Sequence, residues 1–442
     1  MKLRIAVPAL FLMGGAISYG QAIPAGGASM TSSSGGPNFS ALDGVLHYAL
    51  SASEVVQLGY YGSGEVSHST ALTGDVAYTA KSTTYPFSLL GAGGVLLGNL
   101  GPQGTTYYLN TAVSQGLETR HWVFNISDSF SYLPQSPTLG LSGIPGVGDL
   151  GAAPVQGPVQ GPAGGILTNS GNRIANALTG NVERQINHNT SISGSGSWEI
   201  LHFLDESATT GGYDSAQVAG TVALNRRIDA RSSVSVNAVY STLTYSGNIS
   251  ASMYPDIETR GVNLLYQRLL SRTLSINLSA GPQWVSSSNS LVVPSNLNAA
   301  GTASLTYSRK LTNAALGYSH GVNAGSGVLP GAISDSIYGS VGHTYGRKWV
   351  ASINGSYSRS SGLAVLSNGN PLVPVHAVYD TVFGGVQLTR AFGEHFSGYV
   401  SYGIQNQSSN KALAAQNAFS GTANTFGIGV TFTPRSTRLG QF

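Results

Sequence analysis

The sequence contains no cysteine among its 442 residues, and only 9% of its residues are charged. The lack of cysteine excludes disulfide bonds and thiolate metal sites. A soluble protein of this size usually has roughly a quarter of its residues charged. The low charge therefore argues against an ordinary soluble domain and favours a chain with one apolar face and one wet but uncharged face.

The charge that is present has no strong bias, with a net value of +3. No run of Lys and Arg is interleaved with aromatic residues, so nucleic acid is not an expected partner. Metal-ligand spacings, phosphate-binding loops and nucleotide motifs are also missing. We therefore expect neither a metal nor a cofactor.

Long apolar runs are missing as well. After residue 22 no stretch provides the ~20 apolar residues that a membrane helix needs. At the N-terminus, Lys2 and Arg4 precede an apolar run from Ile5 to Ile17, and small residues follow at Gly20-Gln21-Ala22. This order predicts a signal peptide over residues 1–22. The alternative, a single membrane anchor, would need a longer run. The mature chain is then expected to be secreted, periplasmic or a membrane barrel.

Alternation with a period of two dominates the rest of the chain. Residues 23–43 are rich in Gly and Ser and predict a loose periplasmic tail. From residue 44 to 433 apolar and polar residues alternate, as in strands with two different faces. The last segment is the clearest, with Phe426, Ile428, Val430 and Phe432 on one face. In the segment 120–132, Asp128 shares the apolar face, where an unpaired carboxylate is costly.

Short and longer connections alternate between these segments. The segments are about ten residues or more, enough to cross a bilayer as tilted strands. A soluble β-sandwich also alternates, but its strands are usually about 5–6 residues long. We therefore predict a transmembrane antiparallel β-barrel of about 18 strands over residues 44–433, with short periplasmic turns. The stretch 84–99 alternates poorly and leaves the strand count open by two. Tyr240, Tyr245, Trp284 and Trp349 fall near expected strand ends, where aromatic girdles lie.

The face opposite the apolar one is hydrogen-bonding and nearly uncharged. A barrel of about 18 strands leaves an aqueous channel, and a ring of charges, as in ion-selective pores, is not visible. This lining suits neutral polar solutes such as sugars; the alternative is a surface that is merely compatible with water. The candidate pore-lining residues are Glu183, Glu199, Asn237, Asn263, Asn277, Gln283, Asn354, Gln387, Tyr399 and Gln405.

The longest expected loop, 132–177, is the third external one. It is rich in Pro and Gly and cannot form regular structure for long. Loops of this length are usually functional or disordered. Its candidate constriction residues are Asp149 and Arg173.

The arrangement resembles that of general porins, in which the third loop folds into the barrel and narrows the pore. The resemblance covers the architecture of the mature chain and implies insertion by the barrel-assembly machinery and a homo-oligomer, often a trimer, although no interface can be identified in the sequence. General porins place several acids in this loop opposite an Arg cluster, whereas this loop has only Asp149 and no such cluster. Barrel-insertion signals place an aromatic residue on the final strand. Phe432 matches this position, and residues 434–442 then form a periplasmic tail.

A second resemblance is closer in sequence. The stretches YPFSLLGAGG (85–94) and SYLPQSPTLGLSGIPGVGDLG (131–151) resemble outer-membrane barrel proteins of environmental bacteria to which no activity is assigned. Both resemblances imply a location in the bacterial cell outer membrane.

Three functions of a barrel remain open at this point: a channel for small polar solutes, a pore for exopolysaccharide export, and a plugged structural or adhesive barrel without transport. An outer-membrane hydrolase is not expected. The nearest catalytic candidates are His202 with Asp205 and Glu206, and His320 with Asp335, and no nucleophile motif flanks them. The Gly194-Ser195-Gly196 match lies within a strand, where no nucleophile elbow forms.

Overall fold

The computed structural model describes residues 45–59, 66–80, 84–98, 105–133, 173–204, 214–246, 255–323, 329, 331–346, 348–364, 376–410, 418–434 and 437–438. Eighteen long strands form one antiparallel sheet that closes on itself. They are β1 (Val45–Leu58), β2 (Val66–Thr79), β3 (Phe87–Gly98), β4 (Thr106–Glu118), β5 (Trp122–Leu133), β6 (Arg173–Asn187), β7 (Thr190–Phe203), β8 (Asp214–Arg227), β9 (Ser232–Ser246), β10 (Ile257–Leu269), β11 (Leu274–Ser287), β12 (Asn296–Arg309), β13 (Thr312–Asn323), β14 (Ala332–Tyr345), β15 (Trp349–Gly362), β16 (Val378–Ala391), β17 (Phe396–Ser409) and β18 (Gly421–Phe432). The predicted strand number and fold class are confirmed.

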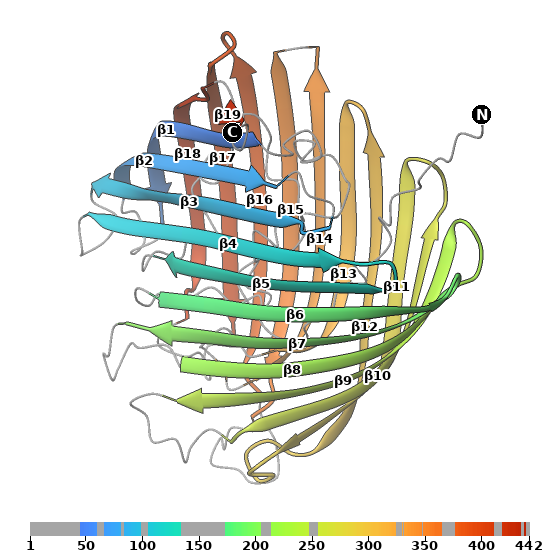
Figure 1. Ribbon diagram of the computed structural model, residues 1–442. Coiled ribbons are helices and arrows are strands. Elements are labelled where there is room, and N and C mark those ends of the chain that lie inside the picture. Colours follow the sequence, from blue (N-terminus) through green and yellow to red (C-terminus); the bar gives the residue numbers. More distant parts are fainter. Residues whose placement is uncertain are drawn as a thin grey trace, which may run out of the picture.

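The barrel closes where β1 pairs with β18, in a register that runs from Leu50↔Phe432 to Leu58↔Asn424. Every other long strand pairs with its neighbours in the chain. In Figure 1 the strands of the near wall cross those of the far wall obliquely, as tilted strands of one barrel do. Closure leaves no long edge strand, so the backbone groups of the wall are paired within the sheet, as a hydrocarbon environment requires.

The chain continues past Pro434, which lacks an N–H and ends β18. A short strand, β19 (Thr437–Arg438), then pairs with Leu46 and Val45 at the start of β1. The chain past Pro434 thus returns to the same seam of the barrel.

Connections of two kinds separate the strands. Eight are short: residues 80–86, 119–121, 188–189, 228–231, 270–273, 310–311, 346–348 and 392–395. They alternate with nine others, which include residues 134–172 between β5 and β6. We call the end of the barrel with the short connections the short-turn rim and the other end the long-loop rim. In outer-membrane barrels the short turns face the periplasm.

The turn between β8 and β9 shows how a short connection is fixed. The Asp229 carboxylate accepts a hydrogen bond from the backbone N–H of Arg231 at 2.6 Å. This bond is the main reason that the pKa of Asp229 lies below its usual range. The depressed pKa adds a little stability above the ordinary carboxyl pKa, and this contribution is lost as the pH falls through the folded-state value.

The two faces of the wall differ as the alternation predicts. On β18, Ile428 is 61% exposed whereas Thr425 is 2% exposed. The exposed face is the outside of the barrel. The buried face is the inside, because buried side chains of strands that are not neighbours meet there: Ile257 of β10 clusters with Leu363, which follows β15. Among the described residues no helix is long and apolar enough to cross a membrane.

The structure tests two expectations about the outer face, the position of Asp128 and the predicted aromatic girdle. Asp128 does face outward, but the Asn176 side chain on β6 donates a hydrogen bond to its carboxylate at 3.0 Å. Tyr245 does not belong to an outer aromatic girdle, because its side chain is buried inside the barrel. Tyr240 and Trp284 are exposed on the outside as expected.

Tyrosine rings on the inner wall lie over glycine. A Cβ placed on Gly429 would lie 2.6 Å from Tyr399 Cε1 and 2.7 Å from the Cβ of Ser53. The Tyr399 ring therefore occupies the space that a side chain at residue 429 would take. This packing joins β17 to β18 next to the seam where the barrel closes.

Replacing Gly429 by Ala is expected to destabilise the barrel by about 1–3 kcal/mol, the usual cost of overpacking. The measurement is urea unfolding in lipid vesicles. Gly403→Ala on β17 is the matched control, because the nearest atom to a Cβ there is 3.8 Å away. Equal stability of the two variants would contradict this account of the seam.

Candidate functional site: the lumen and its mouth

The ten predicted pore-lining residues lie on eight different strands, with Glu183 on β6, Glu199 on β7 and the remaining eight on β9, β10, β11, β15, β16 and β17. All ten occupy the alternate positions of the inner face. Six of them are buried: Glu183, Glu199, Asn263, Gln283, Tyr399 and Gln405. The structure thus brings them to one surface, and their role in solute passage stays a prediction.

Hydroxyl and amide groups of neighbouring strands bond to one another along this inner face. The cross-strand hydroxyl pairs are Ser51–Thr431 at 3.0 Å, Ser127–Thr179 at 2.6 Å, Ser241–Thr259 at 2.7 Å, Ser319–Ser336 at 2.6 Å and Ser334–Ser360 at 2.7 Å. Each pair keeps the short side chains against the wall. The inner surface is therefore polar, and it carries few charges.

Among the described side chains away from the strand ends, the charges within this wall are acidic. Asp75 on β2, Glu183 and Glu199 are all buried on the inner face. Among the described residues, Glu183 Oε1 and Glu199 Oε2 have no hydrogen-bond partner. Arg227 and Glu118 share the inner face only at the ends of their strands, on the short-turn rim. The lumen wall therefore has a negative bias that the sequence analysis did not predict.

The long-loop rim is crossed by an apolar cluster. Tyr245 of β9, Ile257 of β10 and Val293, in the connection after β11, are buried together with Leu363. The Tyr245 side chain also hydrogen-bonds to the backbone of Gly331, just before β14. We call the contacts among these five residues the apolar bridge.

Gly331 is required in the apolar bridge for two reasons. Its φ of +73° is a conformation that residues with a side chain rarely adopt. A Cβ at this position would also lie 2.7 Å from the Ile257 Cδ1 and 2.9 Å from the Leu363 Cδ1. The two methyl groups thus meet over the glycine backbone, and the bridge joins the β9–β10 part of the wall to the part around β14 and β15.

A second apolar cluster continues the bridge toward β16. Leu329 packs with Ala332, Ala377, Tyr379 and Ala418. Leu329 and Gly331 belong to the same connection, between β13 and β14. That connection therefore links the β9–β10 side of the mouth to the β16–β18 side.

The role of the two predicted constriction residues stays a prediction. Asp149 is outside the described residues, and Arg173 is the first residue of β6, with its side chain outside the description. The apolar bridge was missed by sequence reasoning. Its signal was the presence of apolar residues in otherwise polar loops, as in Leu291-Val292-Val293 and Val328-Leu329.

The two histidine candidates for catalysis face outward. His202 bonds to Asp214 at 2.6 Å, and Asp205 and Glu206 lie outside the described residues. His320 bonds to Asp335 at 2.7 Å, and the Tyr318 hydroxyl donates to the same carboxylate at 2.8 Å. In the part of the chain that the structure describes, no group of three or more His, Asp or Glu is arranged to hold a metal.

The decisive feature is the combination of closure, strand number and the two faces. Only a closed barrel lets strands cross hydrocarbon with every backbone group paired, and here 18 antiparallel strands present Leu, Val, Ile and aromatic side chains outward. The chain is a porin-like outer-membrane β-barrel. Its outer face contacts membrane lipid, and its inner face encloses a polar lumen.

No protein-family model and no curated protein matches the chain. Solved structures that it resembles include Pseudomonas aeruginosa OccK2, at 10% identity and a TM-score of 0.43, with 88% of this chain and 98% of that chain covered. P. aeruginosa OpdK has 9% identity, a TM-score of 0.41 and coverages of 89% and 99%. P. aeruginosa OprD has 11% identity, a TM-score of 0.39 and coverages of 90% and 96%. The porin-like assignment rests on the barrel of this chain itself.

Proposed function

We propose that this barrel is an outer-membrane channel for small, polar, neutral solutes such as sugars. The observation that carries the proposal is the inner wall: hydroxyl and amide side chains from neighbouring strands line it, and among the described side chains away from the strand ends its charges are the carboxylates of Asp75, Glu183 and Glu199. A barrel of 18 strands is wide enough to hold an aqueous lumen. Neutral solutes exchange hydrogen bonds with such a wall without meeting a ring of like charges.

The mouth favours small solutes over polymers. The apolar bridge spans the long-loop rim between β9–β10 and the start of β14. A polysaccharide would have to keep the bridge displaced for as long as the polymer passes through the mouth. A monosaccharide is small enough to pass beside the bridge. Export of a polymer and a plugged barrel are therefore the alternatives that the experiment must separate.

Swelling of liposomes that contain the purified barrel tests the proposal. We expect swelling with neutral mono- and disaccharides at rates that fall steeply with solute size. Swelling that continues undiminished with long oligosaccharides would favour polymer export and contradict a small-solute channel. Equal rates with and without protein, for every sugar, would favour the plugged barrel. Deletion of residues 134–172 in the same assay tests whether the third loop narrows the pore as predicted.

A further inference from the structure

A groove of about 880 Å³ lies in the wall of the barrel across β4 to β9. Two rows of outward residues bound it. The upper row, which lies farther from the short-turn rim, comprises Gln115, Ile126, Gly180, Gly196, Gly220 and Tyr240. The lower row, which lies nearer to that rim, comprises Leu117, Phe124, Val182, Gly194, Val222 and Ala238. Between the rows, the groove reaches the backbone of the intervening inward residues, such as Asn181 and Ser195. Because two outward rows flank one inward row, the groove opens to the outside of the barrel.

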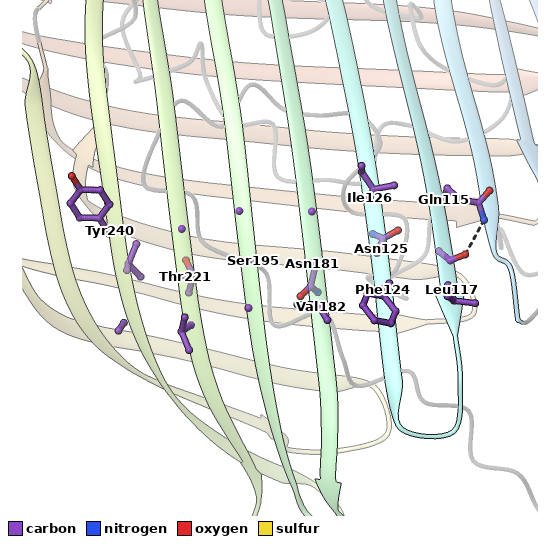
Figure 2. A pocket seen from close by; sticks show the side chains of 18 residues that line it. Gln115, Leu117, Phe124, Asn125, Ile126, Asn181, Val182, Ser195, Thr221 and Tyr240 are labelled. Carbon is purple, nitrogen blue, oxygen red and sulfur yellow. Dashed lines mark hydrogen bonds between the residues drawn. The ribbon is translucent and has the colours of Figure 1, made fainter.

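The groove exists because four of these outward positions are glycine. Gly180 and Gly196 are directly paired, and Gly196 is paired with Gly220. A Cβ on Gly180 would have no atom within 4 Å, and those on Gly196 and Gly220 would have none nearer than 3.8 Å. Figure 2 shows Ile126 and Phe124 at one side of this hollow and Tyr240 at the other. The exposed walls are apolar, formed mainly by Phe124, Ile126 and Val222.

The groove runs away from the short-turn rim as it passes from β4 to β9. Leu117 lies one residue from the end of β4 at the short-turn rim, whereas Tyr240 lies near the middle of β9. The six strands span five intervals of about 4.8 Å, or roughly 24 Å. One leaflet of a bilayer has a hydrocarbon depth of about 15 Å, half of the ~30 Å core. The groove thus starts at the membrane interface and ends within the hydrocarbon, as a tilted lipid chain does.

A cation stands at the interfacial end of the groove. Arg184 is exposed on the outer face, two positions along β6 from Val182 of the lower row. Its guanidinium lies 5.3 Å from the ring of Trp122, and Trp122 stacks on Phe124 of the groove at 5.6 Å. Arg184 makes no salt bridge to any described residue. The other end differs, because Arg260 beyond Tyr240 is paired with Glu258 at 3.0 Å.

We propose that this groove binds one acyl chain of a phosphate-bearing lipid from the leaflet at the short-turn rim, with the lipid phosphate on Arg184. The apolar groove gains packing contacts when a chain fills it. The guanidinium offers donors that match a phosphate, and the stacked Trp122 and Phe124 connect the two parts of the site. A second copy of the chain is the other candidate occupant, and the test separates the two.

The test uses the full-length barrel in detergent, with phosphatidylglycerol as the probe and native mass spectrometry as the readout. We expect one tightly retained phosphatidylglycerol per barrel. The double variant Gly196→Leu with Gly220→Leu fills the groove and should lose this lipid. Arg184→Gln should weaken retention by about tenfold, as expected for the loss of one charge-assisted contact.

Matched controls exist for both variants. Arg390 on β16 is exposed at the same rim and lies 5.0 Å from the ring of its cross-strand partner Trp349, so Arg390→Gln should retain the lipid. Gly74 on β2 also faces outward, with the nearest atom to a Cβ at 3.5 Å, so Gly74→Leu should retain it too. Lipid retention by the groove-filled variant, or equal losses in variant and control, would overturn the proposal. A lipid-free oligomer that the same variant converts to monomers would identify a second copy instead. Retention does not depend on conductance, so this result and the channel proposal can fail separately.

Discussion

Removal of the apolar bridge is expected to raise the single-channel conductance several-fold. The bridge is held by apolar contacts, in which Ile257 and Leu363 meet over Gly331. Hydrophobic constrictions oppose ion passage by excluding water from the narrowest part of a pore. The double variant Ile257→Ser with Leu363→Ser removes both methyl groups from the mouth. Planar-bilayer recording of this variant beside the wild type is the measurement.

The control for this variant is Val55→Ser, which also changes a buried apolar residue of β1 but lies outside the cluster. It should leave the conductance unchanged. Because the chain has no cysteine, a variant with Ile257→Cys and Leu363→Cys can also be bridged by a short bifunctional thiol reagent. Bridging should hold the conductance at or below its wild-type value. An unchanged conductance in the double serine variant would show that the mouth is not the narrowest point.

Replacement of two of the three lumen carboxylates is expected to reduce a preference for cations over anions. Asp75, Glu183 and Glu199 lie within the inner wall, whereas Arg227 lies only at its short-turn end. In a water-filled lumen, one carboxylate near a passing ion contributes about 1 kcal/mol, roughly fivefold in permeability. The wild type should therefore favour K⁺ over Cl⁻ by a few-fold at pH 8.5. The double variant Glu183→Gln with Glu199→Gln should reduce this ratio toward unity.

Reversal potentials in a salt gradient provide the measurement, and ionic strength provides a second check. The preference should decline at high salt, where the Debye length becomes short. The control is Asp128→Asn, which changes a carboxylate on the outer face. A wild-type preference for anions, or a ratio that the glutamine variant leaves unchanged, would contradict a wall-controlled selectivity.

Most of the barrel was predictable because alternation and spacing are local properties. Phe426, Ile428 and Val430 repeat with a period of two, so the chain itself specifies which face of β18 meets lipid. The number of strands followed from the positions of the connections. The segment β3 was harder to predict because Gly91 and Gly93 interrupt its outer apolar face, and its strand character depends on pairing with β2 and β4.

The mouth was not predictable because it is made by contacts between distant parts of the chain. Tyr245 is a partial exception, because it lies eight residues after the inward Asn237 and the alternation already placed it on the inner face, whereas its partner at the mouth could not be identified from the sequence. Its position is set by the parity of β9 and by the hydrogen bond to Gly331. Likewise, Asp128 is acceptable on the outer face because Asn176 is brought beside it by the pairing of β5 with β6.

The outer groove illustrates the same limit. Gly180, Gly196 and Gly220 are scattered in the sequence and form one row only through the registers of β6, β7 and β8. The Gly194-Ser195-Gly196 motif, which sequence reasoning assigned to a strand interior, is part of that groove. Its two glycines leave open space on the outer wall and so help to form the groove.

The central claim is that the lumen is an open aqueous path, and single-channel recording of the purified wild-type protein in planar bilayers tests it most directly. The account predicts steady, discrete current steps at neutral pH in 1 M KCl, with transient blockade when neutral sugars are added. Complete absence of steps from correctly folded barrels, in the wild type and in the bridge-free variant alike, would contradict the channel and leave a closed structural barrel.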